Sequence, residues 1–179
     1  MNLPRNFLGK ILFVSLFLSL LAVTNGNATD LTLSISTPSS PPAGSLTISV
    51  PASISLGTTT SPSTLVFQME TMTVTDSRGT SAGWTASVIV SALTNSGPSA
   101  NTIIPSYMSY SSGVISAHGS GSATFVEHDQ TDLTGQKSVV TAASASGTYS
   151  ATWSPTFTLV VPAGASDGSY TGTITHSVA

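Results

Sequence analysis

The chain has 179 residues, of which 40% are hydrophobic, 4 are basic and 7 are acidic, and it contains no cysteine. This composition excludes disulfide bonds, and the lack of clustered cations argues against nucleic acid or an anionic membrane surface as a partner. The alternating apolar and aromatic residues favour a packed protein over a disordered one.

Residues 1–28 have the composition of a signal peptide that is removed at export. Arg5 and Lys10 give a short positive region, Ile11–Val23 is an apolar run, and a small-x-small cleavage pattern ends at Ala28. The apolar run is about 13 residues long, whereas a membrane-spanning helix needs roughly 20. We therefore expect a cleaved signal helix rather than a retained anchor.

The mature chain, residues 29–179, is long enough for a single domain that buries roughly two-thirds of its unfolded surface. Its basic side chains are Arg78 and Lys137, which stand against seven acidic ones and give a formal charge of −5. We expect a secreted protein with no stable membrane span after the signal is removed.

Apolar residues alternate with serine and threonine along most of the mature chain, as in strands with one buried face. The predicted strands are 31–36, 46–50, 54–56, 65–69, 72–74, 84–90, 123–126, 139–142, 149–153, 157–161 and 170–178. Short strands at 103–104, 107–110 and 114–115 are expected within the segment 95–122, which is rich in Gly, Ser and Pro.

No segment of the mature chain shows helical periodicity, and turn signals recur about every ten residues. This pattern predicts an all-β fold, a mainly antiparallel β-sandwich of Ig-like or barrel-like form. Between Met69 and Met72 the apolar positions change from odd to even numbers. That slip predicts a bulge or a tight turn near Glu70 and Thr71.

A polar turn and a long strand stand together at residues 74–90. Asp76 and Gly79 favour a tight reversal, and Trp84 opens the strand on its buried face. Asp76 and Arg78 are candidates for ligand contacts at the turn. The interpretation that we favour is structural: Asp76 caps the turn backbone, and Arg78 bridges neighbouring loops.

Aromatic residues offer a second kind of candidate site. The faces of Trp84 and Trp153 would suit the C–H face of a sugar ring. Both are in phase with buried aliphatic residues, so packing in the core is the favoured interpretation. The Thr-x-Thr ladders at 71, 73 and 75 and at 171, 173 and 175 could contact a glycan or ice. Solvent-facing strand positions are the favoured interpretation, because threonine suits such positions and the ladders lack a fixed repeat.

The sequence argues against metal binding and catalysis. His118, His128 and His176 have no ligand spacing, and no helix-loop-helix calcium pattern surrounds the acidic run that begins at Glu127. His128 stands next to Asp129 in the sequence, which does not by itself establish the geometry of a triad. We predict no cofactor, no metal and no enzymatic activity.

Two parts of the sequence resemble the WxL domain, a cell-surface module of Gram-positive bacteria. One runs from Val74 to Thr80 (VTDSRGT) and leads through Gly83 to Trp84. The other begins at VPAG, residues 161–164, and continues through Tyr170 to the final TGTITHSV, residues 171–178.

The approach to the final hairpin, with Trp153 followed by Phe157 and Leu159, also resembles this family, so the likeness spans Leu46–Ala179. The chain departs from the family pattern in two places. Ala86 stands where the family has Leu, and in the second motif His176 and Val178 stand where Trp and Leu are usual. These departures would change any apolar surface that the positions offer.

The resemblance implies a secreted protein that is held on the cell wall through peptidoglycan by non-covalent contacts, and that often works with other surface proteins. The residues singled out by these motifs are Asp76, Arg78, Gly79, Trp84, Trp153, Tyr170 and His176. The expected function is non-catalytic binding to the cell wall. The alternatives are a structural subunit that assembles with other exported proteins and a secreted carbohydrate-binding module.

Overall fold

A computed structural model describes residues 12–23, 32–34, 44–51, 54–95, 97 and 101–179, with side chains from residue 44 onward. The regular secondary structure of the described chain is almost entirely strand, in mainly antiparallel sheets, which confirms the predicted all-β fold class. The helical element among the described residues is a single 3-10 turn, η1 (Pro105–Tyr107). No helix in these ranges is both long and apolar enough to cross a membrane.

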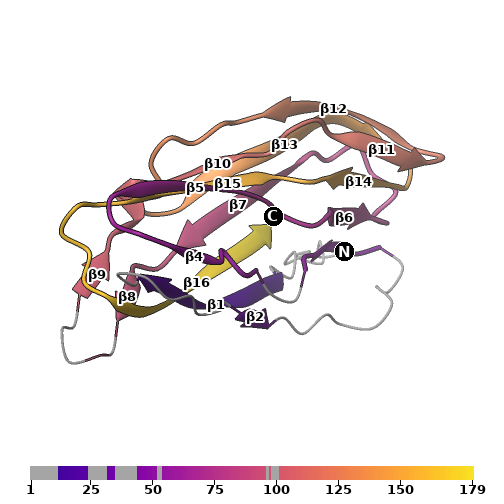
Figure 1. Ribbon diagram of the computed structural model, residues 1–179. Coiled ribbons are helices and arrows are strands. Elements are labelled where there is room, and N and C mark those ends of the chain that lie inside the picture. The colour runs from indigo at the N-terminus through magenta and orange to yellow at the C-terminus, as the bar shows by residue number, and fades with distance from the viewer. Residues whose placement is uncertain (1–11, 24–31, 35–43, 52–53, 96, 98–100) are drawn as a thin grey trace.

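The larger sheet has nine strands, and its main path follows the order β12-β13-β7-β16-β1-β2. Three short strands extend it, because β8 pairs with β16 and β9, and β4 pairs with β1. The bounds are β12 (Ser122–Glu127), β13 (Lys137–Ser146), β7 (Trp84–Val90), β16 (Gly168–Val178), β1 (Leu12–Val23), β2 (Thr32–Ser34), β8 (Leu93–Asn95), β9 (Asn101–Ile103) and β4 (Thr58–Thr59). Figure 1 shows β16 next to β1, with β7, β13 and β12 above them and β2 below.

Two smaller sheets contribute the remaining strands. The first has the order β10-β15-β5, and the second has the order β11-β14-β6-β3. The bounds are β10 (Met108–Ser111), β15 (Thr156–Val161), β5 (Ser63–Gln68), β11 (Ser116–Gly119), β14 (Tyr149–Trp153), β6 (Met72–Asp76) and β3 (Leu46–Ser49).

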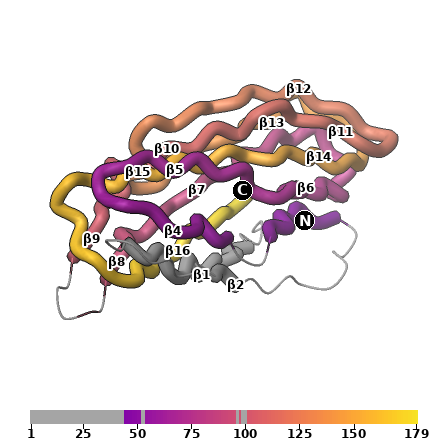
Figure 2. The backbone as a smooth tube through the Cα atoms, viewed as in Figure 1, coloured from indigo at the N-terminus to yellow at the C-terminus, as the bar shows by residue number. Residues whose placement is uncertain are grey.

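Strands of one small sheet continue, after a short break, into strands of the other. Figure 2 traces β5 into β6 and β14 into β15 as continuous paths. The interruptions lie at residues 69–71 and at Ser154 and Pro155, and they are joined by a hydrogen bond of 2.7 Å from the Met69 N–H to the Pro155 carbonyl. Met69, in the break, and Met72, the first residue of β6, are both buried. The slip that the sequence predicts near Glu70 and Thr71 is therefore confirmed.

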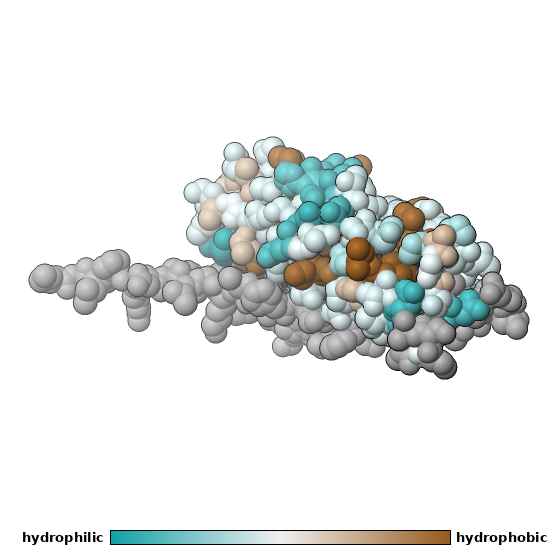
Figure 3. All heavy atoms as spheres, turned by 90° about the vertical axis from the view of Figure 1, so that its left-hand side faces the viewer, coloured by the Kyte–Doolittle hydropathy of each residue, from teal (hydrophilic) through white to brown (hydrophobic). Residues whose placement is uncertain are grey.

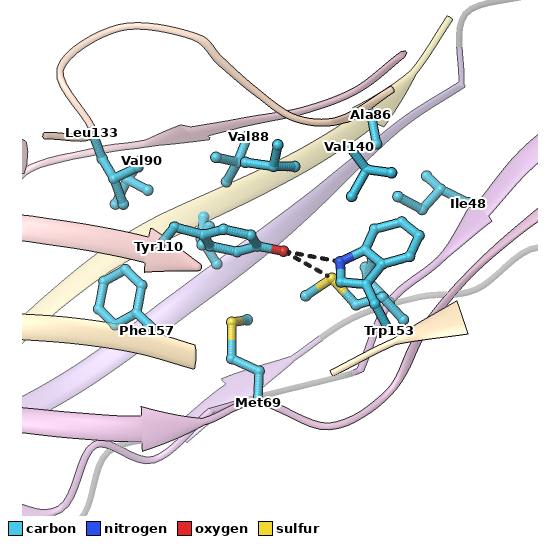
Figure 4. Close-up of a cluster of buried hydrophobic side chains, with 14 of the residues drawn as sticks. Ile48, Met69, Ala86, Val88, Val90, Tyr110, Leu133, Val140, Trp153 and Phe157 are labelled. Carbon is cyan, nitrogen blue, oxygen red and sulfur yellow. Dashed lines mark hydrogen bonds between the residues drawn. The ribbon is translucent and has the colours of Figure 1, made fainter. Parts of the chain in front are cut away.

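The core is one cluster of buried side chains drawn from the large sheet and from both smaller sheets. Val88 and Ile174 come from the large sheet, while Tyr110, Trp153 and Phe157 come from the smaller sheets. Figure 4 shows Tyr110 at the centre of this cluster, between Val88 and Met69. Burial of alternate residues on strands such as β6 and β14 produces this shared core, because successive side chains point to opposite faces.

Some of the predicted strand positions are wrong. Residues 54–56 are not a strand, although Ile54 and Leu56 are buried. Residues 114–115 lie in the break between β10 and β11, and Val114 is 82% exposed. Apolar residues in a loop can pack against the core, or face solvent, without belonging to a sheet, so short apolar pairs do not identify strands reliably.

Residues 12–23 were expected to be the helix of the export signal, but in the structure they form β1, antiparallel to β16. The edge of β16 supplies a row of backbone donors and acceptors, and a neighbouring strand can satisfy these groups whereas a helix cannot. The remainder of the predicted signal, residues 1–11 and 24–28, lies outside the described residues. Removal of the signal stays a prediction.

Candidate functional site

The two segments that carry the motifs lie side by side in the large sheet. β7 pairs with the end of β16, with Val88 opposite His176 and Ala86 opposite Val178. All four of these side chains are buried. The Ala86 and His176 departures from the WxL pattern therefore fall in the interior of the protein.

The turn after β6 is held together by Asp76 and Arg78. The Asp76 side chain is 1% exposed, and its Oδ2 accepts a hydrogen bond of 2.8 Å from Arg78 Nη2. Its Oδ1 accepts from Arg78 Nε at 3.0 Å and from the Arg78 backbone N–H at 3.1 Å. Gly79 follows with a φ of 65°, which glycine adopts without strain. Both carboxylate oxygens are engaged within the turn, so Asp76 is poorly placed to contact a ligand.

Arg78 also spans the loop that leads into β7. Its Nη2 donates to the carbonyl oxygens of Ala82 at 3.0 Å and Gly83 at 3.1 Å. The hydrogen bond to Asp76 raises the pKa of the guanidinium. Gly83 lies against the Ala142 carbonyl of β13, where a Cβ atom would overlap that oxygen. The turn therefore fixes the point at which β7 enters the sheet.

Both tryptophans are buried and hydrogen-bonded to tyrosines. Trp84 is 3% exposed, its Nε1 donates to the Tyr149 hydroxyl at 2.9 Å, and its ring centroid lies 6.0 Å from that of Phe125. Trp153 is 2% exposed, and its Nε1 donates to the Tyr110 hydroxyl at 3.3 Å (Figure 4). Neither indole presents a face on which a sugar ring could stack.

Tyr170 and His176 of β16 are also buried. The Tyr170 hydroxyl donates to the Ser166 carbonyl at 2.9 Å, which ties β16 to the loop before it. The ring centroid of His176 lies 5.8 Å from that of Tyr110, and within the described part of the chain neither imidazole nitrogen has a hydrogen-bond partner. Burial lowers the pKa of His176 to about 3, so the ring is neutral at physiological pH.

The polar candidates do not converge on one site. His118 is exposed on β11, His128 follows β12 and bonds the Thr141 hydroxyl at 3.0 Å, and His176 is in the core. Asp132 accepts hydrogen bonds from Thr134, which lower its pKa. Over residues 44–51, 54–95, 97 and 101–179, no group of three or more His, Asp or Glu residues could hold a metal ion.

One surface feature was indicated only in part by the sequence. The strands of the two smaller sheets turn outward a set of side chains that are mostly hydroxyl-bearing, and we call this surface the hydroxyl face. Its members are Thr47, Ser49, Thr64, Val66, Gln68, Thr73, Thr75, Ser109, Ser111, Ser116, His118, Ser150, Thr152, Thr156, Thr158 and Val160. None of these residues is Asp, Glu, Lys or Arg. The nearby acid Glu70 lies in the break between β5 and β6.

Strand register arranges the hydroxyl face in rows across the sheets. Thr47 pairs with Thr75, which pairs with Ser150, and the adjacent row contains Thr73 and Thr152. The sequence indicated the ladder at 71, 73 and 75, and the structure places Thr73 and Thr75 within these rows. The remaining members of the face lie beside them because strands that are far apart in sequence pair with one another. The sequence pattern alone could therefore not reveal the whole face.

Apolar side chains interrupt the hydroxyl face near one end. Val66 is 69% exposed and Val160 is 42% exposed, on neighbouring strands β5 and β15. Tyr107, 41% exposed, precedes Met108, which pairs with Leu159, so its register position is next to Val160. Figure 3, which views the left-hand end of the molecule in Figure 1, shows apolar residues gathered between hydrophilic ones. The face therefore combines hydrogen-bonding groups with exposed apolar contacts.

Comparisons with known proteins found no match, whether with family models, with curated proteins or with solved structures.

Proposed function

We propose that the protein is an exported, non-catalytic cell-surface protein, a divergent WxL domain, that binds cell-wall peptidoglycan or another surface glycan through the hydroxyl face. The observation that carries this proposal is the uncharged, hydroxyl-rich surface formed by seven strands. Rows of hydroxyl groups can donate to and accept from the hydroxyl groups of a polysaccharide. Val66, Val160 and Tyr107 would contact the apolar faces of its sugar rings.

The burial of the motif residues supports an outer surface as the contact. Trp84, Trp153, Tyr170 and His176 all pack in the interior, so they maintain the sandwich on which the hydroxyl face is presented. Ala86 and His176 differ from the family pattern at buried positions. These substitutions alter the packing of the core and leave the hydroxyl face as it is, which is compatible with wall binding.

The proposal is tested by incubating the purified protein with isolated Gram-positive cell walls and measuring how much protein pellets with them. Thr158 lies on the central strand of its sheet, between Ser109 and Val66 in register. Thr158→Lys should weaken binding by about tenfold, or roughly 1.4 kcal/mol, because a charged side chain is placed in the middle of the face. The matched control is Thr124→Lys, which changes an exposed threonine on β12 of the large sheet.

If the wild-type protein stays in the supernatant, the proposal that it binds the cell wall is wrong. If both lysine variants bind equally well, the hydroxyl face is not the surface that contacts the wall. Both variants should melt at the wild-type temperature, since both positions lie on the outside of their strands.

Assembly with other exported proteins is the second candidate function, and β5 favours it. β5 ends its sheet, and no strand in the described part of the chain pairs with its outer edge. The strand carries no charge, and Val66 at its centre is exposed. Uncharged edges of this kind accept strands from other chains. A pull-down that recovers a protein partner, from cells whose isolated walls do not bind the protein, would favour assembly over wall binding.

A further inference from the structure

The outer edge of β16 is a binding site for a strand. One side of β16 pairs with β7 and β8. Along the other side β1 pairs over nearly the whole strand, from Leu12 opposite Val178 to Val23 opposite Gly168. β16 contains no charged residue and no proline, so each of its residues has a backbone N–H and a carbonyl that can pair with a strand. Without β1 the edge would be open over its full length.

The register places β2 directly beyond β1. Phe17 pairs with both Thr173 and Ser34, and Leu18 pairs with both Gly172 and Leu33. β2 is therefore level with the middle of β16. Because β1 is antiparallel to each of the two strands, β2 runs parallel to β16.

The sequence around β2 matches the alternation of β16. Leu31, Leu33 and Ile35 alternate with hydroxyl-bearing residues. Leu33 is in register with Gly172, because both pair with Leu18. Tyr170 and Ile174 lie two positions before and after Gly172 on β16, on the same face, and both are buried. A move of one strand position, with no slide along the strand, would keep Leu33 on the face of the sheet that carries Tyr170 and Ile174.

We propose that the export segment only holds this edge in the precursor, and that after removal of residues 1–28 β2, residues 32–34, pairs directly and in parallel with β16. The inference rests on the export part of the proposed function. The move covers one strand spacing, about 4.8 Å. The segment is tethered to β3, which begins at Leu46, and this tether gives it an advantage over the same segment of another copy.

We call this replacement of β1 by β2 at the edge of β16 the strand exchange. Pairs of introduced cysteines test the exchange, because the natural chain contains no cysteine. In the uncleaved chain Ser34 and Thr173 lie two strand spacings apart, roughly 9.6 Å, which is beyond the limit of about 7 Å between the Cα atoms of a disulfide. After the exchange they would be neighbours. Phe17 and Thr173 are already register partners in the uncleaved chain.

The full-length gene carrying Ser34→Cys and Thr173→Cys is expressed in a secreting bacterium, and intact mass shows whether residues 1–28 have been removed. The cleaved protein should lose its free thiols on mild oxidation while remaining monomeric. The uncleaved form, retained by Ala28→Arg at the cleavage site, should keep them. The control pair Phe17→Cys and Thr173→Cys should form its disulfide only in that uncleaved form.

Three results would overturn the exchange: a secreted protein that keeps residues 1–28, a cleaved monomer that keeps both thiols, or a disulfide found only between two copies. Wall binding of the same preparations is measured separately by pelleting. Failure to bind walls would contradict the proposed function and would leave the strand exchange standing if the disulfide forms.

Discussion

His176 is a basic side chain placed where charge is unfavourable. It is fully buried beside Tyr110, and burial lowers its pKa to about 3, whereas the unfolded chain should show the ordinary value near 6.5. Between these two pH values the unfolded state binds more protons than the folded state. Stability is therefore fully present above about pH 6.5 and is lost progressively as the pH falls toward 3.

We expect the free energy of unfolding to fall by roughly 2–3 kcal/mol between pH 6.5 and 4.5 because of His176. Chemical denaturation at a series of pH values measures this slope. His176→Phe, which fills similar space without titrating, should remove most of it. The control Ile174→Leu changes a buried side chain of the same strand that does not titrate, and it should leave the slope as in the wild type. An unchanged slope in His176→Phe would show that other groups cause the acid sensitivity.

Trp84 contributes to stability through burial and through its hydrogen bond to Tyr149. Trp84→Ala should reduce the free energy of unfolding by roughly 3–5 kcal/mol, because a large cavity is left and the Tyr149 hydroxyl loses its donor. Thermal melting of this variant beside Tyr107→Ala, a change at an exposed aromatic residue, measures the difference. A normal melting temperature combined with lost wall binding would instead identify Trp84 as a ligand contact.

At the scale of elements, turns and breaks decide how the strands meet. The Asp76 and Arg78 turn is tied to the start of β7, and Gly83 allows that start to lie directly against β13. The break at 69–71 allows the chain of β5 and β6 to bury Met69 and Met72 on the same side despite the change in phase. The elements are therefore joined through specific backbone contacts as well as through apolar packing.

Gly83→Ala should destabilise the protein by about 1–3 kcal/mol, because the added methyl group overlaps the Ala142 carbonyl and the backbone must shift. The matched control is Gly164→Ala, since a Cβ at Gly164 meets nothing within 4 Å. Urea denaturation of the two variants provides the comparison. Equal stability of both would mean that the loop before β7 can move away from β13 without cost.

At the scale of the whole molecule, the low charge of the sequence corresponds to one extended surface without ionised side chains. The hydroxyl face covers the outer side of the two smaller sheets and carries no Asp, Glu, Lys or Arg, while the charged pair Asp76 and Arg78 is used within a turn. Attraction between charges is screened by salt, whereas hydrogen bonds and apolar contacts with a neutral glycan depend on it much less.

Binding to isolated walls should therefore change little between about 0.1 and 1 M sodium chloride, over which the screening length falls from about 10 to 3 Å. Pelleting across this range measures the dependence. A steep loss of binding in high salt would show that charged groups outside the hydroxyl face make the contact. If binding is retained in high salt and is weakened in Thr158→Lys, the results would support the hydroxyl face as the surface that contacts the wall.

The sequence by itself determined the all-β class, most strand positions, the break near Glu70 and the burial of Trp84, because an alternation of period two is a local property of the chain. Only the tertiary structure decided what lies across the sheets. It brought Thr47, Thr75 and Ser150 into one row, left His176 without a hydrogen-bond partner within the described residues, and placed residues 12–23 along β16. Strand pairing joins segments distant in sequence, and which segments pair depends on the shared core and on which edges are open, neither of which a local pattern contains.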